Sequence, residues 1–134
     1  MNPSSKDIAE IMEVSTLALT PGTDLFRFRM PPTPQDCVVV LDISGNEPMV
    51  QLSKDRSDYY YSAVSIQVRN IDYLTGYGIA LDIFQFLHGT AHIIINDTYY
   101  SLIKAMADPQ LLHYDGNDRA VFVINFEVQR RTNL

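Results

Sequence analysis

The chain has 134 residues, of which 46% are hydrophobic and 19% charged, and these values predict one globular domain with an apolar core. Sixteen acidic and ten basic residues give a formal net charge of −6 without a basic block, so we expect no high-affinity duplex-binding surface. No stretch approaches the roughly 20 apolar residues of a membrane helix. We also expect no signal peptide, because residues 1–7 lack an apolar run. The single cysteine, Cys37, precedes the apolar run 38–41, which predicts a buried, unreactive thiol.

The first element is a predicted helix that begins near Ser4 and Ser5, where a serine oxygen can cap free amides and Asp7 favours the helix dipole. Apolar and small residues then recur at helical spacing. They are Ile8, Ile11, Met12, Ser15 and Leu19. The sequence Thr-Pro-Gly at 20–22 ends this helix.

The next segments predict strands separated by turns. Residues 25–30 alternate, with Phe26, Phe28 and Met30 on one face and Arg27 and Arg29 on the other, as in a half-buried strand. The apolar run 37–43 predicts a central strand, and 44–48 a turn. We expect a short strand at 49–52 and a polar, mobile loop at 53–58.

Residues 59–70 form the longest predicted strand. Its inward residues would be Tyr60, Ser62, Val64, Ile66 and Val68, and its outward residues Tyr59, Tyr61, Ser65, Gln67 and Arg69. From Asp72 the apolar spacing becomes helical, with one stripe formed by Leu74, Tyr77, Leu81, Phe84 and Leu87. Gly76 and Gly78 could allow close packing on a sheet, and Gly89 is a plausible stop.

The remaining segments predict antiparallel pairing. Residues 91–95 and 98–105 form a hairpin around Asn96-Asp97, Asp108-Pro109 breaks the chain, and 115–118 is a turn. Residues 119–129 alternate as the last strand, and the tail 130–134 is expected to be loose. The predicted fold is α+β: one domain spanning 1–134, with a mixed, mainly antiparallel sheet and two principal helices packed on one face.

The second face of this sheet carries surplus apolar area. Val121 and Val123 in the last strand, and Tyr59 and Tyr61 in the long strand, point away from the predicted core. A half-apolar second face is typical of contact with a neighbouring subunit. Packing under a local loop is the alternative, and the sequence leaves both open.

Residues that could carry chemistry have simpler structural explanations. His88 and His92 have a spacing that suits a metal only on a continuous helix, and Gly89 predicts that the helix ends between them; His113 is distant in sequence. Ser65 and Ser101 lack a nucleophile-elbow pattern, and Gly76-Tyr77-Gly78 lacks the third glycine of a dinucleotide loop. Most Asp residues lie in turns. We therefore expect no catalytic residues, metal or cofactor.

The triplet Tyr59-Tyr60-Tyr61 could be an aromatic platform for single-stranded nucleic acid. Strand alternation would split the triplet and turn Tyr60 inward. A core tyrosine between two surface or interface tyrosines is therefore the favoured interpretation.

The order of features resembles the tail terminator family of long-tailed bacteriophages, also called tail-to-head joining or minor capsid proteins. The similarity rests on the initial helix, the strand ending at Met-Pro-Pro-Thr-Pro (30–34), the strand 64–69, and the helix end Phe-Leu-His-Gly (86–89). It continues through Ala-Asp-Pro (107–109) and the strand 119–128.

The resemblance implies an α+β fold and a non-enzymatic role in the virion, assembled in the host bacterial cytoplasm. Family members form a hexameric ring on the finished tail tube, stop its growth and present a surface to the head connector, while DNA passes through without specific binding. The implied partners are further copies of the chain, the tail tube protein and the head connector or stopper protein. The chain could remain monomeric in solution.

We expect interface residues on the non-core strand faces. The candidates are Arg27, Arg29, Tyr59, Tyr61, Gln67, Arg69 and Glu127. One alternative function is another neck protein, a head-completion or stopper protein. A second is a small-molecule-binding domain with a pocket between the second helix and the sheet, lined by Tyr77 and Phe84.

Overall fold

The computed structural model describes residues 1–13, 17, 19–49 and 59–132, which fold into a curled sheet with two helices. The elements in chain order are α1 Ser4–Glu13, β1 Leu25–Arg27, β2 Cys37–Met49, β3 Tyr59–Asn70, α2 Tyr73–Leu87, β4 Thr90–Ile95, β5 Thr98–Ala105, β6 Gln110–Tyr114 and β7 Ala120–Thr132. The strands follow the order β1-β2-β3-β7-β5-β4, and β6 also pairs with β7. All pairs are antiparallel except β1 with β2, which confirms a mixed, mainly antiparallel α+β fold.

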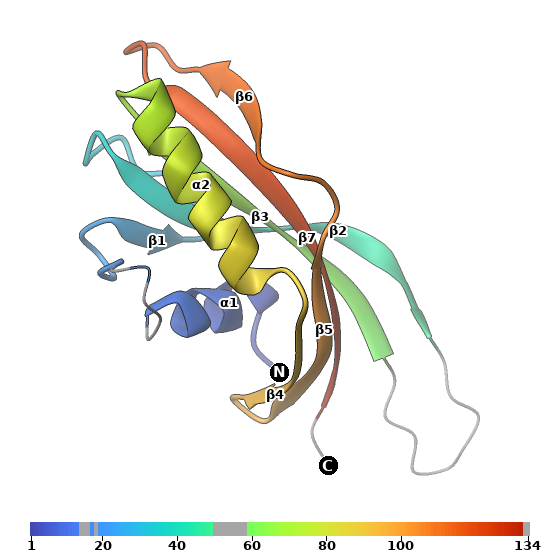
Figure 1. Ribbon diagram of the computed structural model, residues 1–134. Helices are drawn as coiled ribbons and strands as arrows, with labels where there is room; N and C mark the ends of the chain where they lie inside the picture. Colours follow the sequence, from blue (N-terminus) through green and yellow to red (C-terminus); the bar gives the residue numbers. More distant parts are fainter. Residues whose placement is uncertain (14–16, 18, 50–58, 133–134) are drawn as a thin grey trace, which may run out of the picture.

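Both helices lie on the same side of the sheet (Figure 1), and the core fills the space between them. Ile8 and Met12 of α1 and Ile83 of α2 are buried against Val64 and Phe126 of the sheet. The predicted strand 59–70 has the bounds of β3, and its inward residues Val64, Ile66 and Val68 are buried as expected. Tyr60 is the exception, because it lies beyond the helices and is exposed.

α1 is fixed to the sheet by buried polar contacts rather than by a serine cap. The Ser5 hydroxyl donates to Asp42 Oδ2 at 2.6 Å. Asp7, which is fully buried, accepts hydrogen bonds from the Tyr100 hydroxyl and, at 2.8 Å, from Asn96 Nδ2. Burial and the neighbouring Asp7 raise the pKa of the Tyr100 hydroxyl, which therefore stays a hydrogen-bond donor. The described helix ends at Glu13, and Ser15 lies outside the described residues.

The strand predicted over 25–30 is shorter and faces the other way. β1 ends at Arg27 because Phe28 has a φ of 80°, which breaks the alternation. Leu25 is the buried residue of this strand, whereas Phe28 is 56% exposed. The predicted common face of Phe26, Phe28 and Met30 is therefore wrong.

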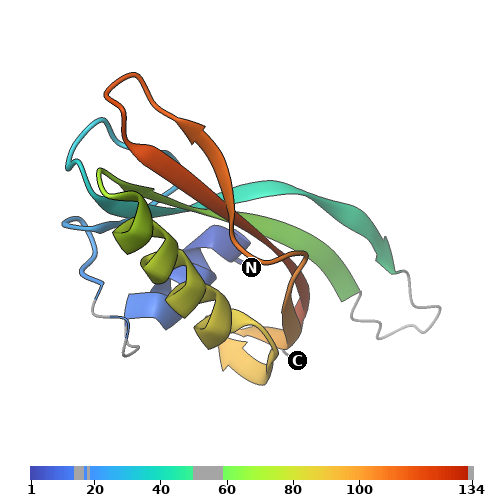
Figure 2. The ribbon, with the colours of Figure 1, turned by 45° about the horizontal axis from the view of Figure 1, so that its top comes forward.

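The turn predicted at 44–48 is also wrong, because β2 continues through it to Met49. The turn-forming residues lie at two register shifts against β3, so that β2 accommodates them without leaving its partner strand. Gly45 is needed at the first, since a Cβ there would lie 2.0 Å from the Tyr61 carbonyl oxygen. The ends of β2 and β3 thus form an arm that extends past the helices (Figure 2). The predicted strand end at 50–52 and the predicted mobile loop at 53–58 lie outside the described residues.

α2 begins where expected but presents a different face. Asp72 caps it by accepting from Thr75 N at 3.0 Å, and the helix ends at Leu87, before Gly89. Its buried residues are Gly76, Ala80, Ile83 and Leu87, whereas Leu74 is 76% exposed. The predicted stripe is therefore wrong at Leu74, whereas Leu87 is buried and Tyr77 and Phe84 pack half-buried against the core.

The second half contains the predicted hairpin, here β4 and β5, joined by Asn96 and Asp97 with positive φ angles that suit a two-residue turn. β6 was not predicted; it occupies 110–114, which the break at Asp108-Pro109 obscured. The tail is not loose over its described part, because β7 remains paired with β5 through Thr132, and 133–134 lie outside the described residues.

Candidate functional site

The sheet face opposite the helices brings together five of the seven candidate interface residues. Cross-strand partners share a face, and the register places Gln67 opposite Val123 and Arg69 opposite Val121. The same alternation adds Tyr59, Tyr61 and Glu127. We call this surface the helix-free face, formed by the odd-numbered residues of β3 (59–69) and of β7 (121–131).

One end of the helix-free face, at the start of β3 and the end of β7, holds an aromatic and cationic cluster. The Arg131 guanidinium carbon lies 4.9 Å from the Tyr99 ring centroid and 5.7 Å from that of Tyr59. These are cation–π distances. Tyr59 and Tyr61 are half-buried on this face, while Tyr60 points to the other side. The tyrosine triplet is therefore split, and the Tyr59 ring packs against Arg131.

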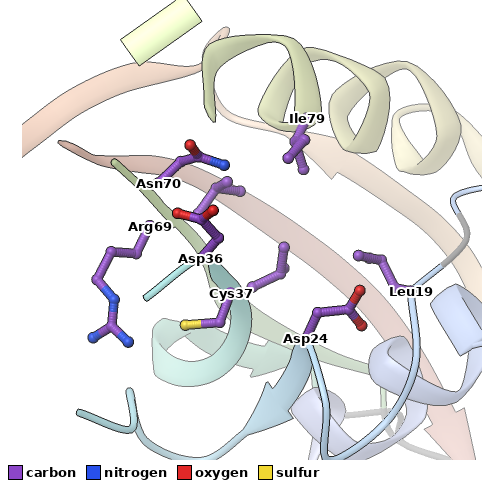
Figure 3. A pocket seen from close by; sticks show the side chains of 9 residues that line it. Leu19, Asp24, Asp36, Cys37, Arg69, Asn70 and Ile79 are labelled. Atoms are coloured by element: carbon purple, nitrogen blue, oxygen red, sulfur yellow. The ribbon is translucent and has the colours of Figure 1, made fainter. Parts of the chain in front are cut away.

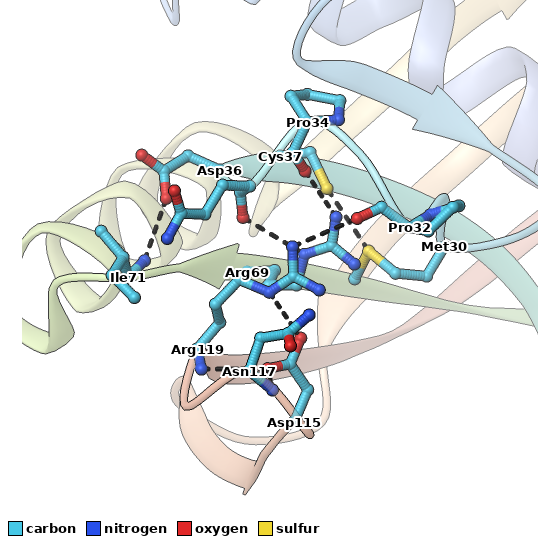
Figure 4. Close-up of polar contacts among 11 residues, drawn as sticks. Met30, Pro32, Pro34, Asp36, Cys37, Arg69, Ile71, Asp115, Asn117 and Arg119 are labelled. Carbon is cyan, nitrogen blue, oxygen red and sulfur yellow. Dashed lines mark hydrogen bonds and ion pairs between the residues drawn. The ribbon is translucent and has the colours of Figure 1, made fainter.

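The other end holds two buried arginines that form hydrogen bonds with a proline-containing segment (Figure 4). We call this segment, residues 31–36, the proline loop. Arg69 is 4% exposed, and its guanidinium donates to the carbonyl oxygens of Pro34 and Gln35. Arg119 is 7% exposed and donates to the Pro32 carbonyl oxygen at 3.2 Å. At this end, packing under a local loop is the correct interpretation of the second face.

The charge of Arg119 is balanced by Asp115 in the turn before it. Arg119 Nε lies 2.7 Å from Asp115 Oδ2, and the backbone amides of Asn117 and Arg119 each donate to Asp115 Oδ1 at 3.0 Å. Desolvation opposes ionisation of Asp115, but these hydrogen bonds and the guanidinium outweigh it and hold the pKa of this carboxyl below its usual value. The turn and the proline loop are thus joined through one arginine.

Two further contacts fix the ends of the proline loop. Asp36 Oδ1 accepts from the Ile71 amide at 2.9 Å, at the start of α2. The Cys37 and Met30 sulfur atoms lie 3.4 Å apart. Burial raises the pKa of the Cys37 thiol, so the predicted buried thiol remains protonated at neutral pH. The proline loop is therefore held at both ends and along its backbone.

The seven candidates do not form one site. Arg69 lies inside the subunit, where its side chain supports the proline loop. Arg27 is exposed on β1 with its guanidinium 5.7 Å from the Phe28 ring centroid, and Arg29 is exposed just after β1. Sequence reasoning missed Arg119, although an arginine directly after the Asp-Gly-Asn-Asp turn is a natural partner for a turn carboxylate.

A small cavity lies between α2 and the start of β2 (Figure 3). Its volume is about 150 Å³, and its labelled lining residues are Leu19, Asp24, Asp36, Cys37, Arg69, Asn70 and Ile79. Two other hollows measure about 280 and 200 Å³. Small-molecule sites typically occupy roughly 300–1,000 Å³, so each of these three hollows is smaller than a typical small-molecule site. Tyr77 lines none of these hollows and instead packs edge-on against Phe122 at 5.8 Å.

The two histidines with metal-like spacing, His88 and His92, make contacts with α2 and with the hairpin of β4 and β5. His88 Nδ1 accepts from the Ala105 amide at 3.0 Å and its ring stacks on Phe84, while His92 Nδ1 lies 2.6 Å from the Tyr99 hydroxyl. Within residues 1–13, 17, 19–49 and 59–132, no three His, Cys, Asp or Glu residues form a group able to hold a metal.

In the same described part of the chain, no helix is long and apolar enough to cross a membrane.

Comparison with known proteins identifies the family. Residues 12–132 match a family model described as bacteriophage tail terminator protein. The chain belongs to this tail terminator family. It is therefore a structural protein of a phage tail and a component of the virion. The matched residues include α2, every strand, the helix-free face and both buried arginines.

The fold of this tail terminator is also similar to a chain in a solved structure titled "Virion of native gene transfer agent (GTA) particle". The two chains are 12% identical, the match covers 95% of this chain and 93% of that chain, and the TM-score is 0.62. At this identity the likeness concerns the fold. None of the curated protein sequences compared with the chain matches it.

Proposed function

We propose that this tail terminator caps the phage tail tube, ends its polymerisation and forms the interface that joins the tail to the head connector, assembled as a hexameric ring. The family match over residues 12–132 is the observation that carries the proposal. The partners are further copies of the chain, the tail tube protein and the head connector or stopper protein.

The helix-free face is the surface that best suits these contacts. Both helices pack on the opposite side, so the backbone of β3 and β7 presents Tyr61, Gln67 and Glu127 as half-buried side chains on a rigid sheet. Partly buried aromatic and polar groups of this kind are typical of protein interfaces. Arg69 contributes from inside, by holding the proline loop beside this face. Arg27 and Arg29 belong to a separate surface at the β1 edge.

The charge of the chain suits a ring through which DNA passes without specific binding. The net charge is −6, and Arg69 and Arg119, two of the ten basic residues, are buried and engaged with backbone carbonyl oxygens. A surface that binds duplex DNA tightly neutralises several phosphates with lysine and arginine. The acidic balance therefore disfavours a stationary complex with the passing genome.

The proposal is tested by mixing the purified protein with connector-free tails and imaging the tail ends by electron microscopy. A cap at the head-proximal end and tubes that no longer elongate when tube protein is added are the expected result. Protein found on DNA-filled heads, with bare tail ends, would instead identify a head-completion or stopper protein. Tails that remain bare and continue to elongate would refute tail capping.

Two matched variants localise the contact. Gln67→Arg places a cation on the helix-free face, and Gln85→Arg makes the same change on the exposed side of α2. We expect Gln67→Arg to reduce the fraction of capped tails severalfold and Gln85→Arg to leave it unchanged, because a buried unpaired charge at an interface is costly. Equal capping by both variants would exclude the helix-free face as the contact surface.

A further inference from the structure

β6 pairs with β7 along one edge, and no described strand pairs with its outer edge. β3 pairs with one edge of β7 along residues 120–130, so β6 takes the other edge, in line with β5. All five residues of β6 are exposed, including Leu112 at 48% and Tyr114 at 56%. No described strand lies along its outer side (Figure 1). The outer edge therefore offers backbone amide and carbonyl groups to solvent, and its exposed residues include apolar side chains.

Two of the features that normally protect an edge, charges and prolines, are absent from this segment. Natural edge strands carry charges, prolines or bulges facing outward, which prevent pairing with other chains. β6 reads Gln-Leu-Leu-His-Tyr, without proline or a formally charged residue. Its one irregularity is a register shift between Leu111 and His113. An edge of this composition is a template for an additional strand.

Other edges of the sheet are less suited to pairing. β1 has only three residues, and β4 is interrupted at His92, which has a φ of 57°. The outer edge of β2 is different, because β1 covers it only from Val38 to Val40. Beyond Val40, no described strand pairs with that edge of the arm, and Ile43 is exposed there.

The two free edges lie on opposite sides of the sheet. β2 pairs with β3, β3 with β7 and β7 with β6, so β2 and β6 are separated by the β3–β7 pair. An interface that joins two different patches of identical subunits is head-to-tail, and it generates a ring when the rotation closes. Two different free edges on opposite sides of one curled sheet meet that requirement.

The chemistry of the arm limits where β6 can pair. Pro48 has no backbone amide to donate, and β2 changes register against β3 after Ile43 and again after Asn46. The stretch 41–43 remains regular. Within it, Asp42 is held on the helix side by Ser5, so no free acid faces an approaching strand. Ile43 supplies an apolar partner for the leucines of β6.

We propose that β6 of one subunit pairs with the free edge of β2, around Leu41–Ser44, of a second copy of this chain, so that the sheet continues from subunit to subunit. This inference rests on the proposed function only for the closure of the contacts into a ring. The pairing itself uses backbone groups and apolar side chains of this chain alone.

Disulfide trapping tests the pairing directly. In a Cys37→Ala background, Leu112→Cys is combined in turn with a cysteine at each position from Leu41 to Ser44. Strand neighbours with Cα atoms about 4.4–6.8 Å apart form disulfides readily. We expect at least one combination to give a ladder of covalent oligomers on non-reducing gels, both on capped tails and in concentrated protein. The Leu112→Cys change alone should give no covalent oligomer.

Three results would overturn the proposal: no ladder from any combination, a dimer from Leu112→Cys alone, which would indicate β6 pairing with β6, or equal trapping at unrelated positions. A second test places a lysine on each of two exposed edges. Here the two cysteines are introduced by Ile43→Cys on β2 and Gln110→Cys on β6. Leu112→Lys should lower the yield of the disulfide between these cysteines severalfold, whereas Ile94→Lys on β4 should leave that yield unchanged. Unchanged melting temperatures of both variants show that the fold is intact.

The two proposals fail in distinguishable ways. Protein that caps no tails but forms the ladder when concentrated would refute the proposed function and keep the strand pairing. Protein that caps tails without any ladder would refute the pairing and keep the function.

Discussion

Two glycines of α2 provide a sharp test of how the helix packs on the sheet. Gly76 is buried, and a Cβ there would lie 3.0 Å from Asn70 Cβ and 3.1 Å from Phe122 Cε2. The Phe122 ring is itself held, because Tyr73 packs edge-on against it with centroids 4.9 Å apart. Gly78 is two residues further along the same helix, and a Cβ there would meet nothing within 4 Å.

The expected energies follow from these distances. Replacing glycine by alanine inside a helix stabilises it by about 0.8–1.0 kcal/mol, and Gly78→Ala should gain this amount. Gly76→Ala gains the same helix stabilisation, but the added methyl group overpacks the contact with Asn70 and Phe122, which typically costs about 1–3 kcal/mol. The net change for Gly76→Ala is therefore about 0–2 kcal/mol of destabilisation, and the two variants should differ by about 1–3 kcal/mol.

Thermal melting followed by far-ultraviolet circular dichroism measures the difference. For a chain of this length, 1 kcal/mol corresponds to about 3–5 °C in Tm. We expect Gly78→Ala to melt about 3–5 °C above the parent protein and Gly76→Ala to melt at or below it. If both variants melt at the same raised temperature, Phe122 and Asn70 yield to the added methyl group, and the argument that close packing selects glycine at 76 is wrong.

Other expected outcomes concern the polar contacts. Tyr100→Phe should lower the free energy of unfolding by about 1–3 kcal/mol in urea titrations, because buried Asp7 loses a donor. Tyr99→Phe removes a hydroxyl whose contact with His92 is exposed, and should change the free energy of unfolding by less than about 0.5 kcal/mol. Equal effects of the two substitutions would contradict the role of Tyr100. Because the pKa of Asp115 is lowered in the folded state, its contribution is complete above about pH 4 and is lost as the pH falls through the folded value. Asp115→Asn should therefore be less stable than the parent at pH 7, with a gap that narrows at pH 3; a constant gap would exclude the ion pair with Arg119 as its source.

Strands with strict alternation were predictable, because one buried side fixes every other residue. β3 has the predicted bounds, and Phe122, Ile124 and Phe126 of β7 point inward as expected. The face of α2 was not predictable in this way, since the helix is apolar nearly all round and periodicity cannot choose among its sides. The small residues Gly76 and Ala80 decide which side approaches the sheet.

The arm shows why turn-forming residues mislead when a strand has a partner. Gly45, Asn46 and Pro48 are typical of a turn, yet β3 provides a continuous partner, and the register shifts absorb them. The helix-free face was predictable, because Tyr61, Gln67 and Glu127 follow the alternation of their strands. The buried roles of Arg69 and Arg119 were not, because they depend on the proline loop, 34 to 87 residues away in sequence.

The attachment of α1 has a consequence for synthesis. Asp7 contacts Tyr100, 93 residues later, and the Asn2 carbonyl oxygen accepts from Arg130, 128 residues later. At about 5–20 residues per second, a ribosome needs roughly 5–20 s to deliver the first of these partners. During that interval the apolar side of α1, with Ile8 and Met12, has no completed sheet to cover it. The last strand of the sheet to emerge is thus the one that closes the domain.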